Sequence, residues 1–343
     1  MRKSERLRFL AGHLLDGSNA SEIADVIPLA CETLTIGALA RGKLNNCGNA
    51  LPEDMVSFFQ EVVSRNRMRN CRLLAQLEEA ATALNEAGIV PILQKGIALL
   101  VAAPHTVETR MNSDLDLIVP KRDFATACMV LSGLGYRRMQ VEARDPSPFG
   151  RERDVGMIDL HSAPRGSERH HGNSLVALHS QVTKFGRSEV LVPSPTLQLL
   201  YLFLHDQFHD LDYFRGNFDL RHALDIVELV EGATAVEWGV LNSILDTTMA
   251  KNALASQMYV TGVLFRNTML TRQFGTWPAR IQHARIMLQL DHAFLAPLMS
   301  VATAVCEFRL HWFAAQGDEP KALIGLARRR MQRLFRQRAN SKV

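Results

Sequence analysis

The sequence has little of several features that define large classes of proteins. Its five cysteines are scattered over 343 residues without a Cys-x-x-Cys pair, which argues against a disulfide framework and against a structural zinc site. The most apolar stretch, residues 87–104, is interrupted by Gln94 and Lys95, and each half is too short to cross a bilayer. Residues 1–20 hold basic side chains but no continuous apolar segment, so we expect no secretory signal. We therefore expect a cytoplasmic protein with free thiols and no transmembrane segment.

Acidic residues are absent from the last part of the chain. Residues 321–343 carry eight Lys or Arg and no Asp or Glu. Because the whole chain has a net charge of +4, all the other residues together carry −4, and only the tail is basic enough to attract nucleic acid. We predict that residues 316–343 form a basic amphipathic tail, which either docks on the helical body or contacts RNA or another anionic partner. Its apolar residues recur at helical spacing: Leu323, Ala327, Met331, Leu334 and Phe335.

The spacing of apolar residues divides the chain into three parts ahead of this tail. Residues 1–85 repeat apolar side chains every three or four positions, which predicts helices. Residues 86–193 alternate short β-branched runs with short helical patterns, which predicts a small mixed β-sheet. Ser194 and Pro195 form a good helix start, and helical patterns continue over residues 194–315. The predicted fold class is α+β, with a small mixed-sheet core flanked by N-terminal and C-terminal helical regions.

The middle part contains several strand candidates. A turn-rich segment, residues 143–153, separates the third candidate from the fourth, and a polar stretch precedes the last. The candidate strands are residues 89–93, 114–120, 136–142, 154–163 and 188–193.

Two aspartates stand one residue apart in the second of these strands, within RMNSDLDLIVP at residues 110–120. Side chains alternate between the two faces of a strand, so Asp114 and Asp116 share one face while the leucine after each points into the core. Two such carboxylates on a rigid strand are suitable hard oxygen ligands for Mg²⁺. Asp159, in the strand segment MIDLH, supplies a third carboxylate. The alternative is that strand-end aspartates only cap the following turn.

Lys95 and Gly96 lie between the first strand and a helix, just upstream of the paired aspartates. The N-terminus of a helix presents free N–H groups that bind anions. Gly96 would let a phosphate approach the backbone closely, and Lys95 adds a positive charge. The alternative is a plain strand-to-helix turn with a solvated lysine.

These residues, taken in order, resemble the nucleotidyltransferase superfamily of DNA polymerase β. They are most similar to a poorly characterised bacterial branch with the pattern LKG…R…DxDLLV…GY…hDLH. The resemblance covers roughly residues 85–230, and Gln94 and Lys95-Gly96 depart from the leucine of the branch and the Gly-Ser of the best-known members. The residues that carry it are Lys95-Gly96, Arg110, Asp114-Leu115-Asp116, Gly135-Tyr136, Ile158-Asp159-Leu160-His161, and then His205, His209 and Asp225 on later helices.

The resemblance implies an enzyme that depends on Mg²⁺, with Mn²⁺ as the alternative ion. It would move a nucleoside monophosphate from an NTP such as ATP to an acceptor hydroxyl on a small molecule, a protein or an RNA end, releasing pyrophosphate. Asp114, Asp116 and Asp159 would hold the metal and carry catalysis, and Lys95 and Gly96 would contact phosphate. The acceptor and the base of the NTP stay open, because fold analogy does not settle a substrate. The alternative is a catalytically inactive nucleotide-binding or antitoxin-like regulatory protein on the same fold.

Two candidates within the core have two interpretations each. Arg110 either binds phosphate or pairs with a carboxylate to hold its loop. His161 either orients Asp159 or ends its strand in solvent. The pair His170-His171, in a polar loop, receives no specific role.

Two further histidines, His205 and His209, stand at i and i+4 on one predicted helix face. This spacing suits a transition metal, but no third ligand is apparent at metalloprotease spacing, so we do not predict a zinc site. We expect the two histidines to line the nucleotide or acceptor cleft, or to pack with Asp206 and Asp210.

Overall fold

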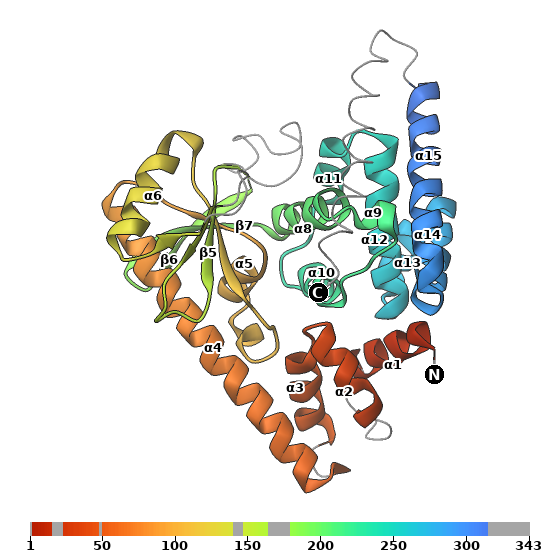
Figure 1. Ribbon diagram of the computed structural model, residues 1–343, viewed down its shortest axis with the longest axis horizontal. Coiled ribbons are helices and arrows are strands. Elements are labelled where there is room, and N and C mark those ends of the chain that lie inside the picture. Colours follow the sequence, from red (N-terminus) through yellow and green to blue (C-terminus); the bar gives the residue numbers. More distant parts are fainter. Residues whose placement is uncertain (1, 16–22, 48–49, 140–146, 164–178, 315–343) are drawn as a thin grey trace.

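The computed structural model describes residues 2–15, 23–47, 50–139, 147–163 and 179–314. The sheet and its helices lie on one side of the molecule, the C-terminal helices on the other, and the N-terminal helices below both (Figure 1). The predicted basic tail at residues 316–343, the pair His170-His171 and the end of the predicted third strand lie outside the described residues.

The N-terminal region is helical, as its apolar spacing predicts. The chain turns between the second and third helices at Leu34, whose φ of 54° is left-handed. Residues 53–86 form one long helix that ends just before Gly88, where φ is 76°, a conformation that glycine adopts without strain. The helices are α1 (Lys3–Leu15), α2 (Ile23–Glu32), α3 (Ile36–Cys47) and α4 (Glu53–Glu86).

The helix α4 connects the N-terminal region to the sheet and crosses the lower part of Figure 1 as the long diagonal helix. Phe59 and Val63, in its first half, join a core that the N-terminal helices share with C-terminal helices. Leu73, Leu77 and Leu84, in its second half, join the core on one face of the sheet. The predicted domain division after residue 85 stays a prediction. The helix α4 contributes residues both to the core of the N-terminal helices and to the core of the sheet.

The described strands form one seven-stranded mixed sheet with the order β3-β4-β5-β2-β1-β7-β6. The pairs β2–β5 and β1–β7 are parallel, and the other pairs are antiparallel. The aspartate-bearing strands β2 and β5 therefore lie side by side in the middle of the sheet. The strands are β1 (Ile92–Leu93), β2 (Asp114–Ile118), β3 (Arg137–Arg138), β4 (Ser147–Gly150), β5 (Met157–His161), β6 (Ser180–Phe185) and β7 (Ser188–Pro193).

The predicted strands differ from the sheet in two places. The strand β4 forms inside the segment predicted as turn-rich, because Phe149 is fully buried opposite Ile158 of β5. The strand β6 forms in the polar stretch, where it pairs with β7 at the edge of the sheet. An edge strand is solvated and carries polar side chains, so apolar periodicity does not reveal it.

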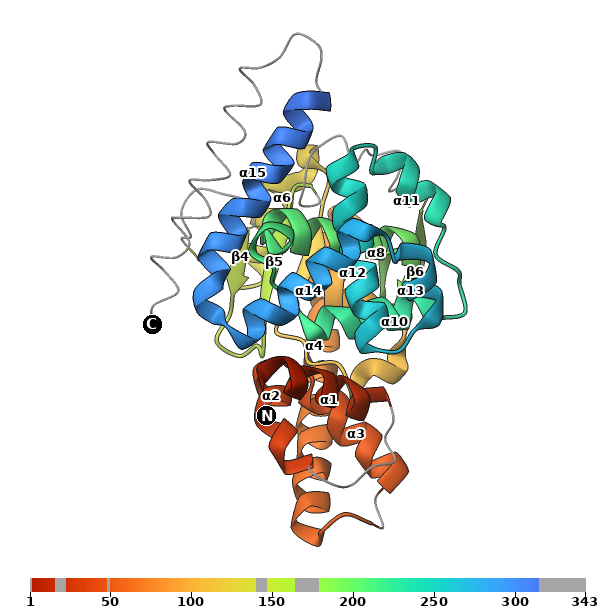
Figure 2. The ribbon, with the colours of Figure 1, turned by 90° about the vertical axis from the view of Figure 1, so that its right-hand side faces the viewer.

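Short helices link the strands, and a helical domain follows them. Ser194 accepts a hydrogen bond from the Leu197 N–H at 3.4 Å, with Pro195 at the first helical position, which confirms the predicted helix start. Figure 2 shows this domain packed above the N-terminal helices, with α15 along one side. The helices are α5 (Lys95–Ala102), α6 (Phe124–Gly133), α8 (Pro195–Phe203), the π-helical turn Leu204–His209, α9 (Asp212–Arg215), α10 (Leu220–Glu231), α11 (Trp238–Ile244), α12 (Thr248–Leu264), α13 (Thr268–Phe274), α14 (Trp277–Asp291) and α15 (Ala296–Ala314).

Among the described helices, none combines the length and the apolar character that a membrane span requires.

Candidate active site

The two aspartate-bearing strands are aligned so that their carboxylates face each other. In the parallel pairing of β2 with β5, Asp116 lies opposite Asp159 and Asp114 lies opposite Met157. Leu115 and Leu117 alternate with the aspartates and are fully buried in the sheet core. Strand alternation therefore puts all three carboxylates on the face opposite that core.

Asp116 is the most buried member of the group, with 3% of its surface exposed. Its Oδ1 lies 2.8 Å from Nζ of Lys95 and 3.3 Å from Nε2 of His161. Burial by itself would raise the pKa of Asp116, but the hydrogen bond from His161 and the charge of Lys95 outweigh it and hold that pKa well below its usual range. Asp116 is therefore a carboxylate at neutral pH, ready to act as a ligand.

His161 corrects the sequence-based expectations for this position. The ring is only 1% exposed, so the strand does not end in solvent, and the residue does not line a cleft. The ring contacts Asp116 rather than Asp159. His161 and Asp159 are two residues apart on β5, so both lie on the same face of the sheet as Asp116 of the neighbouring strand.

Asp159 is less buried than Asp116 and lies in a field of like charge. Its pKa is raised, first by burial and then by the negative charges of Asp116 and Asp114. Asp114 is partly exposed and accepts a hydrogen bond from Oγ of Ser113 at 3.0 Å. One ligand atom from each of Asp116, Asp159 and His161 lies within 4.8 Å of the others.

This donor set fits a divalent cation. The carboxylates are hard oxygen ligands of the kind Mg²⁺ prefers, and their mutual repulsion, seen in the raised pKa of Asp159, is what a bound cation relieves. The ammonium group of Lys95 already balances part of this charge on Asp116.

Lys95 occupies a strained backbone position at the start of α5. Its φ is 50°, in the left-handed region that residues with a Cβ rarely adopt. The N–H of Gln94, the residue before it, donates to the Asp116 backbone oxygen at 3.0 Å and joins this turn to β2. The lysine side chain is 16% exposed and paired with Asp116, so it is not the solvated lysine of the plain-turn alternative.

Arg110 pairs with a carboxylate, which is the second of its two predicted roles, and phosphate binding by this residue stays a prediction. Its Nε and Nη2 donate to the two oxygens of Asp225 at 2.8 and 2.7 Å, and its Nη1 donates to Asn112. The arginine and the aspartate are both buried. The guanidinium therefore has its donors engaged inside the protein, where it connects the loop before β2 to helix α10.

The side of Gly96 that a side chain would occupy is also filled. A Cβ on this residue would collide with the guanidinium of Arg110 and the side chain of Asn112. Glycine at this position leaves room for the side chains of Arg110 and Asn112, and a contact of Gly96 with phosphate stays a prediction.

The loop before β2 is held from the other side by α4. Nδ2 of Asn70 donates to the backbone oxygens of Val107 and Arg110, both at 2.8 Å, and Nδ2 of Asn66 donates to that of Glu108 at 2.8 Å. Sequence reasoning missed this group of asparagines, because a polar residue on a helix carries no sign of a partner some forty positions away. The loop delivers Asp114 to its place on β2, so these contacts position the carboxylate pair.

A second cluster of charged groups lies in the C-terminal helical domain. Asp206, 3% exposed, binds Nδ1 of His222 at 2.8 Å and Nε2 of Gln257 at 2.9 Å. His205 also contacts it, with Nδ1 at 3.1 Å. His209 contacts Asp210, with Nδ1 at 2.8 Å, so the expected packing of the two histidines with Asp206 and Asp210 is observed. The partner His222 was not predicted, although its position three residues after Asp219 and three before Asp225 on α10 was visible in the sequence.

The His222–Asp206 pair predicts a pH-dependent stability. Burial alone would lower the pKa of His222, but the charge and hydrogen bond of Asp206 raise it from 6.5 to about 9. A raised folded-state pKa gives a stabilising contribution that is complete below about pH 6.5 and is lost as the pH rises through about 9. We expect His222→Gln to lower the free energy of unfolding by roughly 3 kcal/mol at pH 6 and much less above pH 9, measured by urea denaturation in buffer with a chelator. The control is His105→Gln, at an exposed histidine. If the free energy of unfolding of His222→Gln differs from that of the parent by the same amount at every pH, His222 does not have the raised pKa.

Comparison with known proteins agrees with this geometry. Aligned strand carboxylates on a mixed-sheet core between helical regions are what the resemblance to nucleotidyltransferases predicts. The chain belongs to the uncharacterised nucleotidyltransferase family, whose model matches residues 21–266. The resemblance to nucleotidyltransferases and the α+β fold class are thereby confirmed, and family membership supports nucleotidyl transfer as the activity.

Other comparisons add little. A search of curated proteins found no match. The solution structure of the antibiotic-resistance factor ANT(2'')-Ia matches with a TM-score of 0.35 and 14% identity, over 60% of this chain and 97% of that one. A likeness at this level does not bear on the acceptor.

Proposed function

We propose that the protein is a Mg²⁺-dependent nucleotidyltransferase that joins a nucleoside monophosphate from an NTP to an acceptor hydroxyl and releases pyrophosphate. The observation that supports it most is the alignment of Asp116 with Asp159 across two parallel strands, with Asp114 two residues away on the same face. Asp114, Asp116 and Asp159 would hold the metal, which neutralises charge on the triphosphate and lowers the pKa of the acceptor hydroxyl. The acceptor oxygen attacks the α-phosphorus, and the bond from that phosphorus to the oxygen bridging to the β-phosphate breaks.

Asp159 is the proposed acceptor of the hydroxyl proton. It is less buried than Asp116, which lies opposite it on the neighbouring strand, so it is the more accessible of the two to an acceptor. Asp116 keeps its charge through Lys95 and His161 and serves as a ligand only.

The alternative is a catalytically inactive nucleotide-binding or regulatory protein on the same fold. The observation that favours it is the start of α5, where Arg110 and Asn112 fill the space beside Gly96.

One experiment separates the two functions. The purified protein is incubated with Mg²⁺ or Mn²⁺ and each α-labelled NTP, with tRNA, cell extract and the protein itself as acceptors. Transfer of label to any acceptor supports the enzyme, and NTP binding without transfer supports the alternative.

Lys95 allows a more specific test of phosphate binding. We propose that its ammonium group contacts the triphosphate, and a hydrogen bond between charged groups contributes about 1.5–3 kcal/mol. Lys95→Ala should therefore lower kcat/KM for the NTP about 10- to 100-fold, while the exposed Lys121→Ala, just after β2, should leave it unchanged. Unchanged kinetics in Lys95→Ala would restrict the lysine to its ion pair with Asp116.

A further inference from the structure

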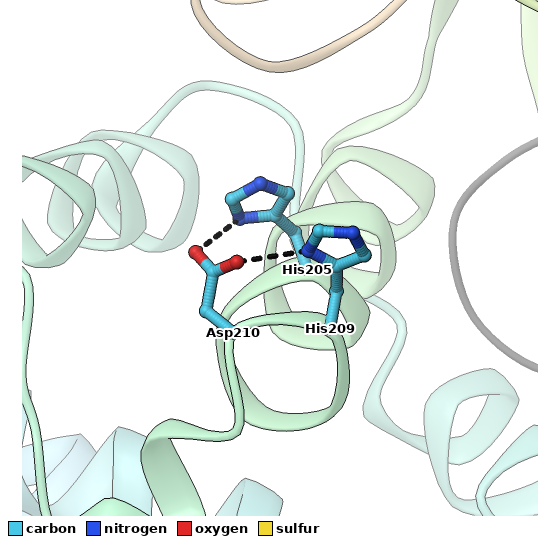
Figure 3. Close-up of side chains that lie close together, drawn as sticks. All are labelled: His205, His209 and Asp210. Carbon is cyan, nitrogen blue, oxygen red and sulfur yellow. Dashed lines mark hydrogen bonds and ion pairs between the residues drawn. The ribbon is translucent and has the colours of Figure 1, made fainter. Parts of the chain in front are cut away.

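Two histidines and one aspartate converge at the end of the π-helical turn Leu204–His209, outside the carboxylate site of the sheet. Figure 3 shows both imidazoles turned toward the carboxylate of Asp210. Nδ1 of His209 lies 2.8 Å from Oδ1 of this carboxylate, and Nδ1 of His205 lies 3.5 Å from its Oδ2. The two rings stack, with centroids 5.4 Å apart and planes inclined by 16°, and each directs its Nδ1 toward Asp210.

The backbone explains how Asp210 reaches both rings. Its N–H donates to the backbone oxygen of His205 at 2.9 Å, and Leu211, directly after it, turns the chain at a left-handed φ of 63°. The bond from Asp210 to His205 spans five residues, as in a π-helix, so Asp210 continues the turn and its side chain lies beside that of His205. A π-helical turn is rare, and single turns of this kind are frequent at functional sites.

The spacing of the donors suits one transition-metal ion. One ligand atom from each of His205, His209 and Asp210 lies within 4.8 Å of the other two. Donors on one tetrahedral ion at bond lengths of about 2.1 Å stand roughly 3.4 Å apart, close to the 2.8 and 3.5 Å that join each histidine to the aspartate. Only small side-chain movements separate the observed arrangement from a coordinated one.

Buried partners hold the site from the inside while its outer edge stays open. Asp206 contacts Nδ1 of His205 at 3.1 Å and is itself fixed by His222 and Gln257, so it holds the His205 ring in place beside Asp210. The side chains of His209 and Asp210 are 40% and 43% exposed, which leaves a path for an ion and room for water or a ligand in its remaining coordination positions.

We propose that His205, His209 and Asp210 bind one divalent transition-metal ion, such as Zn²⁺ or Co²⁺, at a site separate from the carboxylates of β2 and β5. Imidazole ligands favour such ions over Mg²⁺, so the two sites differ in the ions they prefer. The third ligand, which the sequence did not reveal, is the residue next to His209, and the π-helical hydrogen bond from its N–H to the backbone oxygen of His205 places it at the site.

The test measures metal binding and does not require nucleotidyl transfer, so its result does not depend on whether the proposed function is correct. The full chain is stripped with a chelator and titrated with Co²⁺ in excess Mg²⁺, followed by visible absorption and calorimetry. We expect one equivalent to bind with the absorption of a nitrogen- and oxygen-liganded ion. We expect His209→Ala to weaken binding about 100-fold or more, which corresponds to about 2.7 kcal/mol or more.

Matched variants decide the location of the ion. Asp210→Asn keeps the volume of the ligand but removes its charge, and it should also weaken binding. His105→Ala removes an exposed histidine whose ring lies 3.0 Å from the carboxylate of Glu228, and it should have no effect. Asp159→Asn, which removes a carboxylate of the sheet site, should have no effect either. The proposal is overturned if the parent binds no Co²⁺ under these conditions, if His209→Ala binds as tightly as the parent, or if Asp159→Asn removes the bound equivalent.

Discussion

Replacing Asp116 by alanine is expected to lower nucleotidyl transfer roughly a thousand-fold or more, about 4 kcal/mol in activation free energy. Asp116 is buried, ionised and aligned with Asp159, so its loss removes the central proposed metal ligand and leaves Lys95 and His161 facing each other without their anion. The measurement is the steady-state rate of label transfer with the most reactive NTP and acceptor, at saturating Mg²⁺.

Because Asp116 is buried, its replacement could also unfold the protein, so a second variant separates the two effects. Asp159→Asn keeps the shape of a partly exposed side chain and removes only its charge, and it should reduce transfer by a similar factor with an unchanged melting temperature. Asp123→Ala, an acid on the segment just after β2, should act like the parent. Transfer at the parental rate by both Asp116→Ala and Asp159→Asn would overturn the enzymatic proposal.

Replacing Arg110 by alanine is expected to lower the free energy of unfolding by about 3–5 kcal/mol. The change leaves Asp225 buried without its bidentate partner, and an uncompensated buried charge is strongly destabilising. The same change frees the loop before β2 from α10. The measurement is urea denaturation, in which the midpoint should fall while the slope stays constant.

Three further variants test the cause of that loss. Arg110→Lys keeps the charge but not the planar fork, so it should be intermediate. The double variant Arg110→Met with Asp225→Leu removes both charges and should recover much of the stability. Gly96→Ala should also destabilise, because its methyl group displaces the guanidinium. If Arg110→Ala instead keeps full stability and raises the KM for the NTP, the arginine is a phosphate ligand after all.

The sheet shows where local pattern was sufficient and where it failed. The strands β2 and β5 were predicted because each alternates buried leucine or isoleucine with aspartate, a period set by the backbone alone. The strands β4 and β6 were not predicted, since Pro148 and the surrounding turn residues of β4 and the polar side chains of β6 obscure that period. Only pairing with β5 and β7 makes these segments strands.

For the charged residues too, some features were predictable from the local sequence and others were not. The sequence by itself determined that Asp114 and Asp116 share a face and that Ser194 starts a helix, because both depend on neighbours within a few positions. The order of the nucleotidyltransferase motifs was also read directly along the chain. Only the tertiary structure decided that Arg110 pairs with Asp225, that His161 contacts Asp116 and that Asp210 lies against His205. The first two contacts depend on how distant elements pack, and the third depends on a π-helical turn. Neither is encoded in the spacing of residues along a single helix or strand.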